Sequence, residues 1–256
     1  MRIFVCLKQV PARDSVLRID PAAAGVDDAD FSYEMNEPDA FALEEALRLK
    51  EKHGGEVVAV SAGPARAAST IREALAKGAD RGVLIEDDRL ASADTLVTAR
   101  ALAAALRKEE CDLVLTGLQS DDAGFGQTGV LVAEMLGLPH ATIIVEVVAD
   151  GATLRLKREL EAGWFQRIEM DMPALLTIQS GINKVRYATL MGIKKAKSKP
   201  LARYSPDDLG VSLAPSQSVQ RLYTPAKTKQ TEMIEGAPDE IAKKLVDKLK
   251  FEARVL

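Results

Sequence analysis

The residues of this chain that could bind an anionic ligand are concentrated in residues 112–136. A short apolar run ends at Gly117, a polar and turn-prone segment follows over residues 119–125, and apolar residues then recur with helical spacing from Gly126. This order predicts a strand, a loop and a helix. The first backbone N–H groups of a helix lack partners within it and carry partial positive charge, so a phosphate group can bind there. The segment therefore predicts an anion-binding loop.

Residues 124–129 also match the glycine pattern of the dinucleotide-binding fingerprint, Gly-x-Gly-x-x-Gly. That fingerprint needs its first glycine directly after the strand, and here six residues separate Gly124 from Gly117. We therefore do not interpret the match as that fingerprint. The alternative to a nucleotide site is a surface turn at the start of a helix.

Two carboxylates, Asp121 and Asp122, lie in the same loop. Beside a phosphate they would repel it, unless they cap backbone N–H groups, accept a hydrogen bond from a ribose hydroxyl or hold a cation. They limit any interpretation of the loop as a simple phosphate site.

Composition excludes several classes of protein. The chain has 256 residues, 47% hydrophobic and 28% charged, so we expect a folded, soluble protein without a membrane span. The net charge of −4 argues against a general nucleic-acid binder. Two cysteines and two histidines provide neither a disulfide framework nor a metal cluster. The first ten residues lack the pattern of a secretion signal, so we expect a cytoplasmic protein, or a mitochondrial matrix protein in a eukaryote.

The first 136 residues alternate between strands and helices. The predicted strands are 3–7, 56–61, 82–85 and 112–117, and the predicted helices are 41–52, 65–76, 92–109 and 126–136, with a loop over residues 11–25. This predicts an α/β fold with a doubly wound, mostly parallel, Rossmann-like sheet. The carboxyl ends of parallel strands share one edge, so residues 6–10, 36–39, 62–64 and 117–128 are predicted to line one ligand crevice.

The pattern changes after Pro139. Residues 142–148, 153–160, 164–170 and 174–179 are predicted as strands, with turns typical of antiparallel hairpins that extend the sheet. Residues 184–204 carry seven Lys or Arg and no acid around the apolar centre Leu190–Ile193. A solvated basic loop is one interpretation, and docking on an acidic partner is the other.

The chain after Tyr204 is polar up to Gly236, and residues 238–250 then predict an amphipathic helix. We predict that residues 205–256 form an extended arm that lies on another subunit. Residues 1–204 are then the nucleotide-binding domain, including the basic segment 184–200.

Several longer motifs follow one another along the chain. They are V-x-x-K-x-V at Val5, Lys8 and Val10, Glu44-Glu-Ala-Leu-Arg-Leu-Lys-Glu-Lys, Val60-Ser-Ala-Gly-Pro, Thr70-Ile-Arg-Glu-Ala-Leu-Ala-Lys-Gly-Ala-Asp-Arg-Gly, Gly117-x-Gln-x-x-Asp with Gln127-Thr-Gly, Lys157-Arg-Glu-Leu-Glu-Ala-Gly with Met172-Pro-Ala, and Arg186-Tyr-Ala-Thr-Leu. With these motifs, nearly the whole chain resembles the β subunit of electron-transferring flavoproteins. Many motifs in the right order are more specific than any one of them.

The resemblance implies a heterodimer with an α subunit, which holds most of an FAD while the arm of the β subunit wraps around it. The β subunit itself would bind AMP and act as an electron carrier rather than an enzyme. The residues implied for the nucleotide are Cys6, Asn36, Glu37, Pro38, Asp39, Ala62, Gly117, Leu118, Gln119, Ser120, Asp121, Asp122, Ala123, Gly124, Phe125, Gly126, Gln127 and Thr128.

Leu190 falls on the leucine of the recognition loop with which this family docks acyl-CoA dehydrogenases, before electrons pass to a quinone-linked or other oxidoreductase. The other residues implied in docking are Met191, Ile193, Lys194, Lys195 and Lys197. Met191 and Gly192 stand where the mammalian loop has Pro-Asn, which leaves the partner open.

Two alternatives remain. Electron-bifurcating members, which hold a second FAD in the β subunit, carry Gly-Asp-Thr where this chain has Ala123-Gly-Phe, so the loop favours AMP. A nucleotide-hydrolysing or stress-type ATP-binding protein of related fold is disfavoured, because the chain lacks the S-G-G-x-D-S loop, a Walker A loop and a metal-ligand cluster.

Overall fold

The computed structural model describes residues 1–20, 25–226 and 231–256. Contacts divide these residues into two units, Met1–Gln220 and Arg221–Leu256, which we describe separately. Part of the predicted loop 11–25 and part of the predicted arm 205–256 lie outside the described residues. The domain boundary after Tyr204 stays a prediction.

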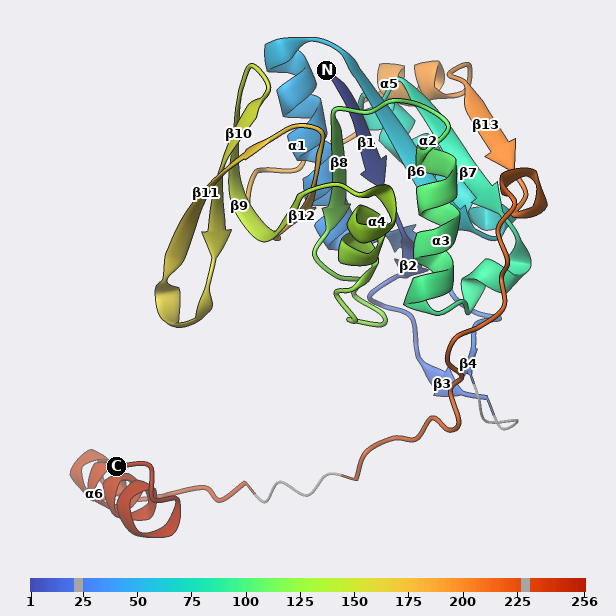
Figure 1. The fold of residues 1–256 in the computed structure, drawn as a ribbon. Coiled ribbons are helices and arrows are strands. Elements are labelled where there is room, and N and C mark those ends of the chain that lie inside the picture. The colour runs from blue at the N-terminus through green and yellow to red at the C-terminus, as the bar shows by residue number, and fades with distance from the viewer. Residues whose placement is uncertain (21–24, 227–230) are drawn as a thin grey trace. The chain divides into compact units, whose positions relative to one another are not determined.

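One nine-stranded sheet organises the first unit (Figure 1). Its strands, in spatial order, are β11 (Phe165–Asp171), β10 (Thr153–Glu159), β9 (His140–Asp150), β12 (Ala174–Ile178), β8 (Leu113–Gly117), β1 (Arg2–Cys6), β6 (Glu56–Gly63), β7 (Arg81–Glu86) and β13 (Leu201–Tyr204). The six strands from β12 to β13 pair in parallel, and β9–β10–β11 form an antiparallel extension. The predicted parallel sheet with antiparallel additions is confirmed.

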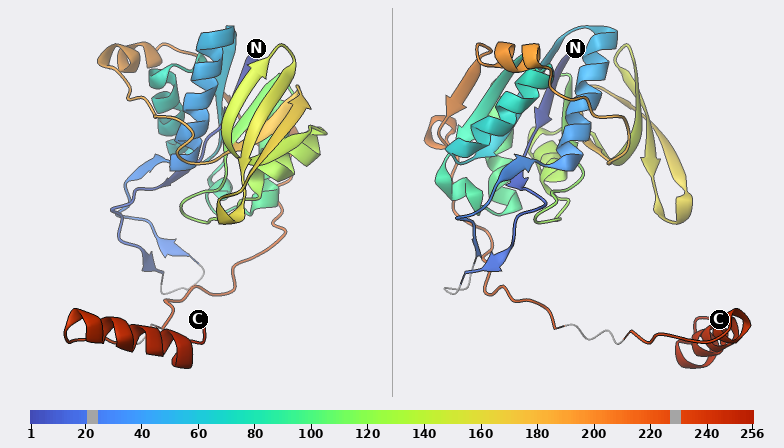
Figure 2. Two further views of the ribbon diagram at one scale, coloured as in Figure 1. Left: turned by 90° about the vertical axis from the view of Figure 1, so that its left-hand side faces the viewer. Right: turned by 180° about the vertical axis from the view of Figure 1, so that it is seen from behind.

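Helices cover both faces of the sheet, as Figure 2 shows. The helices of the first unit are α1 (Glu37–His53), α2 (Ala68–Lys77), α3 (Thr95–Leu106), α4 (Thr128–Leu136) and α5 (Leu190–Ala196). Successive residues of β1 point to opposite faces, so Ile3 and Val5 pack in the core with α1 and α2, while Phe4 and Cys6 pack with α3 and α4. The fold is therefore doubly wound.

Strand β12 corrects one sequence prediction. The turn spacing predicted antiparallel hairpins through residue 179, but β12 lies between β8 and β9 and pairs in parallel with both. All five of its residues are buried. A short run of apolar residues buried on both faces is typical of a parallel strand, and this property is a better guide here than the turn spacing.

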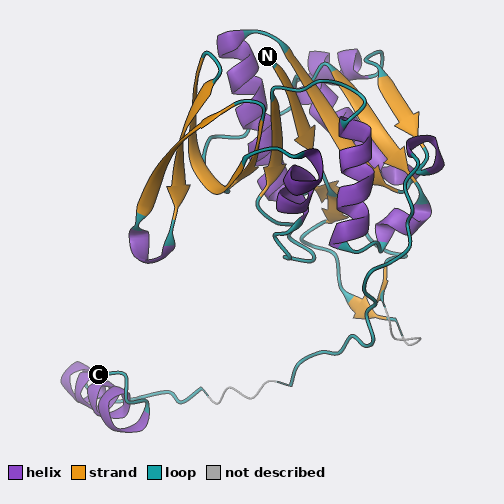
Figure 3. Ribbon diagram, viewed as in Figure 1, coloured by secondary structure: helices purple, strands orange, loops and turns teal. Residues whose placement is uncertain are grey.

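Two segments predicted as loops contain regular structure (Figure 3). Residues 9–35, which include the predicted loop 11–25, contribute short strands β2 (Gln9–Pro11), β3 (Arg18–Ile19), β4 (Val26–Asp27) and β5 (Tyr33–Met35), paired as β2–β5 and β3–β4. The basic segment forms α5 and the edge strand β13, so its interpretation as a loop is wrong. Short 3₁₀ helices occur at Ala65–Ala67, Asp88–Ala91, Glu161–Gly163 and Asp207–Leu209.

The second unit contains the predicted closing helix, α6 (Pro238–Asp247), which continues as a π-helical turn at Lys248–Glu252. Pro238 occupies the first turn, where its missing N–H costs nothing, and Asp239 and Glu240 favour the same end of the helix dipole. Leu245, Val246 and Phe251 are exposed. Among the described helices, none is long and apolar enough to cross a bilayer.

Candidate functional site

A pocket lies at the carboxyl ends of β1, β6 and β8, where the parallel-sheet rule predicts a ligand crevice. Thirteen of the residues predicted to bind a nucleotide line it, namely Cys6, Asn36, Asp39, Ala62, Gly117, Leu118, Gln119, Ser120, Ala123, Phe125, Gly126, Gln127 and Thr128. Glu37, Pro38, Asp121, Asp122 and Gly124 do not line it. Whether the lining residues bind a nucleotide stays a prediction.

The Asp39 carboxylate bonds to backbone N–H groups at the ends of two strands. Asp39 lies in the first turn of α1 and is only 6% exposed. Its Oδ2 accepts a hydrogen bond from the N–H of Lys8 at 2.7 Å, and its Oδ1 accepts one from the N–H of Gly117 at 2.9 Å. Burial raises the pKa of Asp39 to about 7, against the opposing effect of these hydrogen bonds. The carboxylate satisfies two backbone donors that would otherwise be left unpaired where β1 and β8 end.

Gly117 must be glycine for this arrangement. A Cβ atom there would lie 2.4 Å from Asp39 Oδ1 and 2.7 Å from the Asp39 backbone nitrogen. The close approach of α1 to the end of β8 therefore depends on the missing side chain.

Asn36 fixes the loop above Asp39. It is 1% exposed, its Nδ2 donates to the carbonyl of Gln119 at 2.9 Å, and its Oδ1 accepts from the N–H of Asp121 at 2.9 Å. One side-chain amide thus satisfies a carbonyl and an N–H of the loop that precedes α4. The junctions 36–39 and 117–128, far apart in the chain, are held together as the sheet-edge rule predicts.

The two carboxylates of the loop both interact with protein groups. Asp121 Oδ2 accepts from the N–H of Glu37 at 3.3 Å, at the start of α1. Asp122 forms an ion pair with Lys8 Nζ at 2.6 Å and accepts from the N–H of Ala123 at 2.7 Å. Lys8 holds the pKa of Asp122 below its usual range, against the opposing effect of burial. Neither carboxylate lines the pocket. Their hydrogen bonds to backbone N–H groups and the ion pair with Lys8 hold both side chains away from it.

Helix α4 begins at the pocket. Gln127, Thr128 and Gly129 line it, and the side chain of the N-cap residue Gln127 makes no capping hydrogen bond. A Cβ on Gly129 would meet Thr116 Oγ1 at 2.6 Å, so this glycine lets the helix start close to β8. The first turn of α4 therefore presents backbone donors and the positive end of the helix dipole to the pocket.

The wall formed by α3 was missed by sequence reasoning. The pocket is also lined by Leu7, Lys8, Leu90, Ala91, Ala93, Thr95, Thr98, Leu102, Thr116 and Gly129. Asp94 caps α3 by accepting from the N–H of Val97 at 2.8 Å, and Thr95 Oγ1 donates to Gln127 Oε1 at 3.0 Å. The signal was available, because residues 87–94 follow the carboxyl end of β7 and the edge rule applies to them equally.

Cys6 does not act as a reactive group in this pocket. It is 6% exposed. Burial raises the pKa of its thiol to about 12, and the negative charge of Asp39 acts in the same direction with a smaller effect. A thiol of this kind stays protonated at neutral pH, so Cys6 serves as a small apolar wall residue. In the described part of the chain, no group of three or more His, Cys, Asp or Glu could hold a metal ion.

Five of the six residues predicted to dock a partner lie on α5, and Lys197 directly follows it. Leu190 is 81% exposed, Met191 61% and Ile193 46%, and Lys194, Lys195 and Lys197 are also exposed. Thr189 caps this helix by accepting from the N–H of Gly192 at 3.0 Å. We call the six residues Leu190, Met191, Ile193, Lys194, Lys195 and Lys197 the α5 face.

The interactions of two arginines, Arg186 and Arg72, hold the α5 face in place. On one side, Arg186 pairs with the buried Glu44 at 2.7 Å and with Glu51, which keeps the pKa of Arg186 above its ordinary value. On the other side, Arg72 donates to the carbonyls of Ala196 and Lys199 at 2.7 and 2.9 Å.

Gly192 brings α5 against α2. A Cβ there would lie 2.2 Å from the carbonyl oxygen of Ala76. The exposed apolar residues of the α5 face therefore stand on a rigid support, packed on α2 and anchored to α1, rather than on a loose loop.

Comparisons with known proteins show the family of this chain. A model of the electron transfer flavoprotein domain matches residues 25–209. The protein named electron transfer flavoprotein subunit beta from Methylophilus methylotrophus is 42% identical over 257 residues, covering 96% of this chain and 97% of that protein. The proteins of that name from Bacillus subtilis (strain 168) and Homo sapiens are 35% and 38% identical, covering 100% and 95% of this chain and 100% and 96% of their own lengths. This chain belongs to the electron transfer flavoprotein family, among its β subunits.

Proposed function

We propose that this chain pairs with an α subunit to form a heterodimeric electron-transferring flavoprotein, and that its own pocket binds AMP. The name shared by its relatives, subunit beta, supports a partner subunit. The FAD of the heterodimer would lie mostly on the α subunit and supply the redox chemistry. The chain itself would act as an electron carrier subunit rather than as an enzyme.

The observation that carries the proposal is that the first residues of α4 line the pocket. Backbone donors of the first turn suit the phosphate of AMP, and Lys8 adds a cation whose charge is shared with Asp122. Small residues, among them Ala62, Ala91 and Ala93, line the other walls and leave room for a flat base. The described residues therefore fit an adenylate that binds without taking part in chemistry, and such a ligand stabilises the fold by mass action.

The electron donors we propose are flavin dehydrogenases of the acyl-CoA dehydrogenase type, and the acceptor is a quinone-linked or other oxidoreductase. The support is the α5 face, where an exposed leucine is surrounded by cations on a rigid helix. An apolar centre supplies contact area, while the surrounding lysines steer an acidic partner into place.

Counting ligands tests the nucleotide assignment. The purified heterodimer is denatured, and the released AMP and FAD are measured per mole of heterodimer by chromatography. We expect one AMP and one FAD. Two FAD and no AMP would instead favour the electron-bifurcating alternative, and ATP turnover by the chain without affinity for a flavoprotein partner would favour a nucleotide hydrolase.

Leu190→Ala tests the docking assignment. We expect electron transfer from an acyl-CoA dehydrogenase to the heterodimer to slow about tenfold, because a central apolar anchor is lost while bound FAD and AMP stay unchanged. Leu17→Ala is the matched control, since Leu17 is also exposed, at 67%, but lies outside the α5 face. Equal rates in the wild type and Leu190→Ala would contradict the assignment.

We also propose a cytoplasmic location, or the mitochondrial matrix in a eukaryotic cell. The relative from Oryza sativa subsp. japonica is named as mitochondrial. Cell fractionation followed by immunoblotting tests this location.

A further inference from the structure

Asp94 lies where the nucleotide pocket meets the chain that leads toward the carboxyl terminus. It is 9% exposed and immediately precedes α3. Its Oδ1 accepts from the N–H of Val97 at 2.8 Å, and its Oδ2 accepts from the N–H groups of Ser216 and Gln217 at 2.6 and 3.2 Å. One carboxylate therefore caps a helix and attaches a segment more than a hundred residues away.

The same helix start forms a wall of the nucleotide pocket. Thr95 and Thr98 line the pocket, and Thr95 Oγ1 donates to Gln127 Oε1 at 3.0 Å. Gln127 precedes the first turn of α4, which we propose as the phosphate site. A ligand that contacts Thr95 or Gln127 thus restrains the start of α3, and with it the position of the Asp94 carboxylate.

A second hollow confirms how close the two regions are. It shares Thr95, Gly126 and Gln127 with the nucleotide pocket, and Ser216 and Gln217 also line it. The hydrogen bonds of Asp94 hold its pKa below the usual range, against the opposing effect of burial, so the group stays charged at neutral pH. A charged acceptor makes stronger hydrogen bonds than a neutral one.

We infer that Asp94 is a positioning residue that couples nucleotide binding to the attachment of residues 216–217. When the pocket is filled, α3 and α4 are fixed relative to each other, and the Asp94 carboxylate holds both N–H groups of the segment. When the pocket is empty, the start of α3 moves more freely and the segment detaches more often. This inference rests on the proposed function, because it takes AMP as the ligand.

Coupling of this kind is reciprocal, so it can be measured both as an effect of AMP on the attachment of the segment and as an effect of the attachment on AMP affinity. If AMP strengthens the attachment of residues 216–217 by some factor, breaking that attachment must weaken AMP binding by about the same factor. A residue that merely stabilises the fold would not produce matching factors.

Hydrogen–deuterium exchange on the full chain provides the first measurement. The chain is freed of nucleotide, AMP is added, and exchange is followed in peptides that contain Ser216 and Gln217. We expect AMP to raise the protection of these amides about threefold. AMP that binds without changing their protection would overturn the inference and leave the proposed function intact. Absence of AMP binding would overturn both.

Two variants break the attachment from opposite sides. Asp94→Asn keeps one oxygen for the N–H of Val97 but turns an NH₂ group toward the N–H groups of Ser216 and Gln217, so donors face donors. Ser216→Pro removes one of those donors and leaves the α3 cap untouched. We expect each variant to bind AMP about threefold more weakly by calorimetry, with little further protection on adding AMP.

Ser216→Ala is the matched control, because it keeps the backbone N–H and should behave as the wild type. The Ser216→Pro variant also keeps the test valid if Asp94→Asn folds poorly. Unchanged AMP affinity in Ser216→Pro, together with a threefold protection change in the wild type, would violate reciprocity and overturn the coupling.

Discussion

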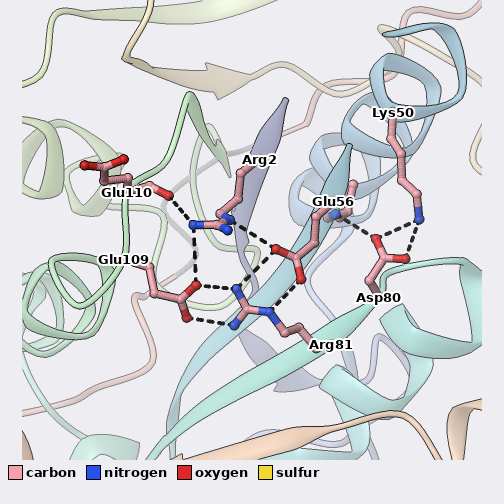
Figure 4. A network of polar contacts seen from close by, with 8 residues as sticks. Arg2, Lys50, Glu56, Asp80, Arg81, Glu109 and Glu110 are labelled. Atoms are coloured by element: carbon pink, nitrogen blue, oxygen red, sulfur yellow. Dashed lines mark hydrogen bonds and ion pairs between the residues drawn. The ribbon is translucent and has the colours of Figure 1, made fainter. Parts of the chain in front are cut away.

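The two edges of the central sheet are built in opposite ways. At the amino ends of the strands, charged side chains close the edge (Figure 4). Arg81 pairs with Glu56 at 2.7 Å and with Glu109 at 2.6 Å, and Arg2 pairs with Glu56 at 3.1 Å. At the carboxyl ends, the buried groups Asn36 and Asp39 bind backbone atoms instead, and the pocket stays open above them.

The difference separates the roles that we assign to the two edges. The charges of the amino edge pair with one another, whereas our proposal places the ligand at the carboxyl edge. At the carboxyl edge, the carboxylates are used to position loops, so the backbone donors of α4 are left for an anion. We therefore expect changes at the amino edge to affect stability alone, and changes at the carboxyl edge to affect both stability and AMP binding.

The largest expected effect is that of Gly117→Ala. The new Cβ would lie within 2.4–2.7 Å of atoms of Asp39 and Pro38, and backbone atoms cannot move away cheaply. We expect the free energy of unfolding to fall by about 3 kcal/mol, the upper range for overpacking a dense core, and AMP binding to weaken more than tenfold. Chemical denaturation and calorimetry measure the two effects.

Gly25→Ala is the control for this substitution, because a Cβ there meets nothing within 4 Å. A Gly117→Ala variant that binds AMP as tightly as Gly25→Ala would show that the close approach of α1 to β8 does not shape the pocket.

The second prediction is that the buried carboxylate Asp39 at the carboxyl edge and the half-buried carboxylate Glu56 at the amino edge give opposite pH dependences. Burial raises the pKa of Asp39 to about 7, so the folded state binds more protons than the unfolded state between about pH 4 and 7. The contribution of Asp39 to stability therefore falls as pH rises through that range. Arg81 lowers the pKa of Glu56, so the contribution of Glu56 is present above its ordinary pKa and is lost as pH falls through the lower folded value.

Denaturation curves of the wild type, Asp39→Asn and Glu56→Gln between pH 3 and 8 measure this contrast. The stability advantage of the wild type over Asp39→Asn should shrink from pH 4 to 7, whereas its advantage over Glu56→Gln should grow from pH 3 to 5. Parallel profiles for the two variants would contradict the contrast.

The third prediction concerns the amino edge alone. Arg81→Met keeps much of the apolar stem of the side chain but leaves Glu56 and Glu109 without their shared guanidinium. We expect the free energy of unfolding to fall by about 1–2 kcal/mol, because the ion pairs of Arg81 are only partly exposed. The Kd for AMP should stay within twofold of the wild-type value. Arg89→Met is the control, because Arg89 is exposed and pairs with the nearby Asp87; it should leave the free energy of unfolding close to that of the wild type. Weaker AMP binding in Arg81→Met would show that the edges are not independent.

The carboxyl edge was predictable from the sequence where its loops carry distinctive residues. Asn36 and Asp39 stand out at the start of a predicted helix and residues 117–128 after a predicted strand, and the parallel-sheet rule brings their junctions together. The wall of α3 was missed because the residues that line the pocket there are alanines, threonines and leucines, which are common on any helix. The sequence also could not predict the partners of Asp121 and Asp122, because Glu37 and Lys8 lie more than 80 residues away along the chain.

The helix α5 shows a different limit of sequence reading. Residues 190–196 form a helix of only seven residues, too short to be stable alone. Its stability depends on α2, through Gly192 against Ala76 and through Arg72 bonded to its last carbonyl. Such distant contacts leave no local pattern, so the charge of the segment suggested a loop.

The smallest expected effect separates the two neighbouring carboxylates of the loop. Asp122→Asn removes a negative charge and releases Lys8, which lines the pocket, whereas Asp121→Asn removes the same charge and leaves the pair of Lys8 with Asp122 intact. We expect Asp122→Asn to bind AMP two- to fourfold more tightly at low salt, a gain of about 0.4–0.8 kcal/mol typical of an exposed ion pair, and Asp121→Asn to change the affinity less than 1.5-fold. The difference should shrink at about 0.5 M salt, because screening acts on exposed charges. Equal gains in both variants would mean that the affinity for AMP depends only on the net charge of the loop. Asp121 and Asp122 would then act by long-range electrostatics and not by controlling the position of Lys8.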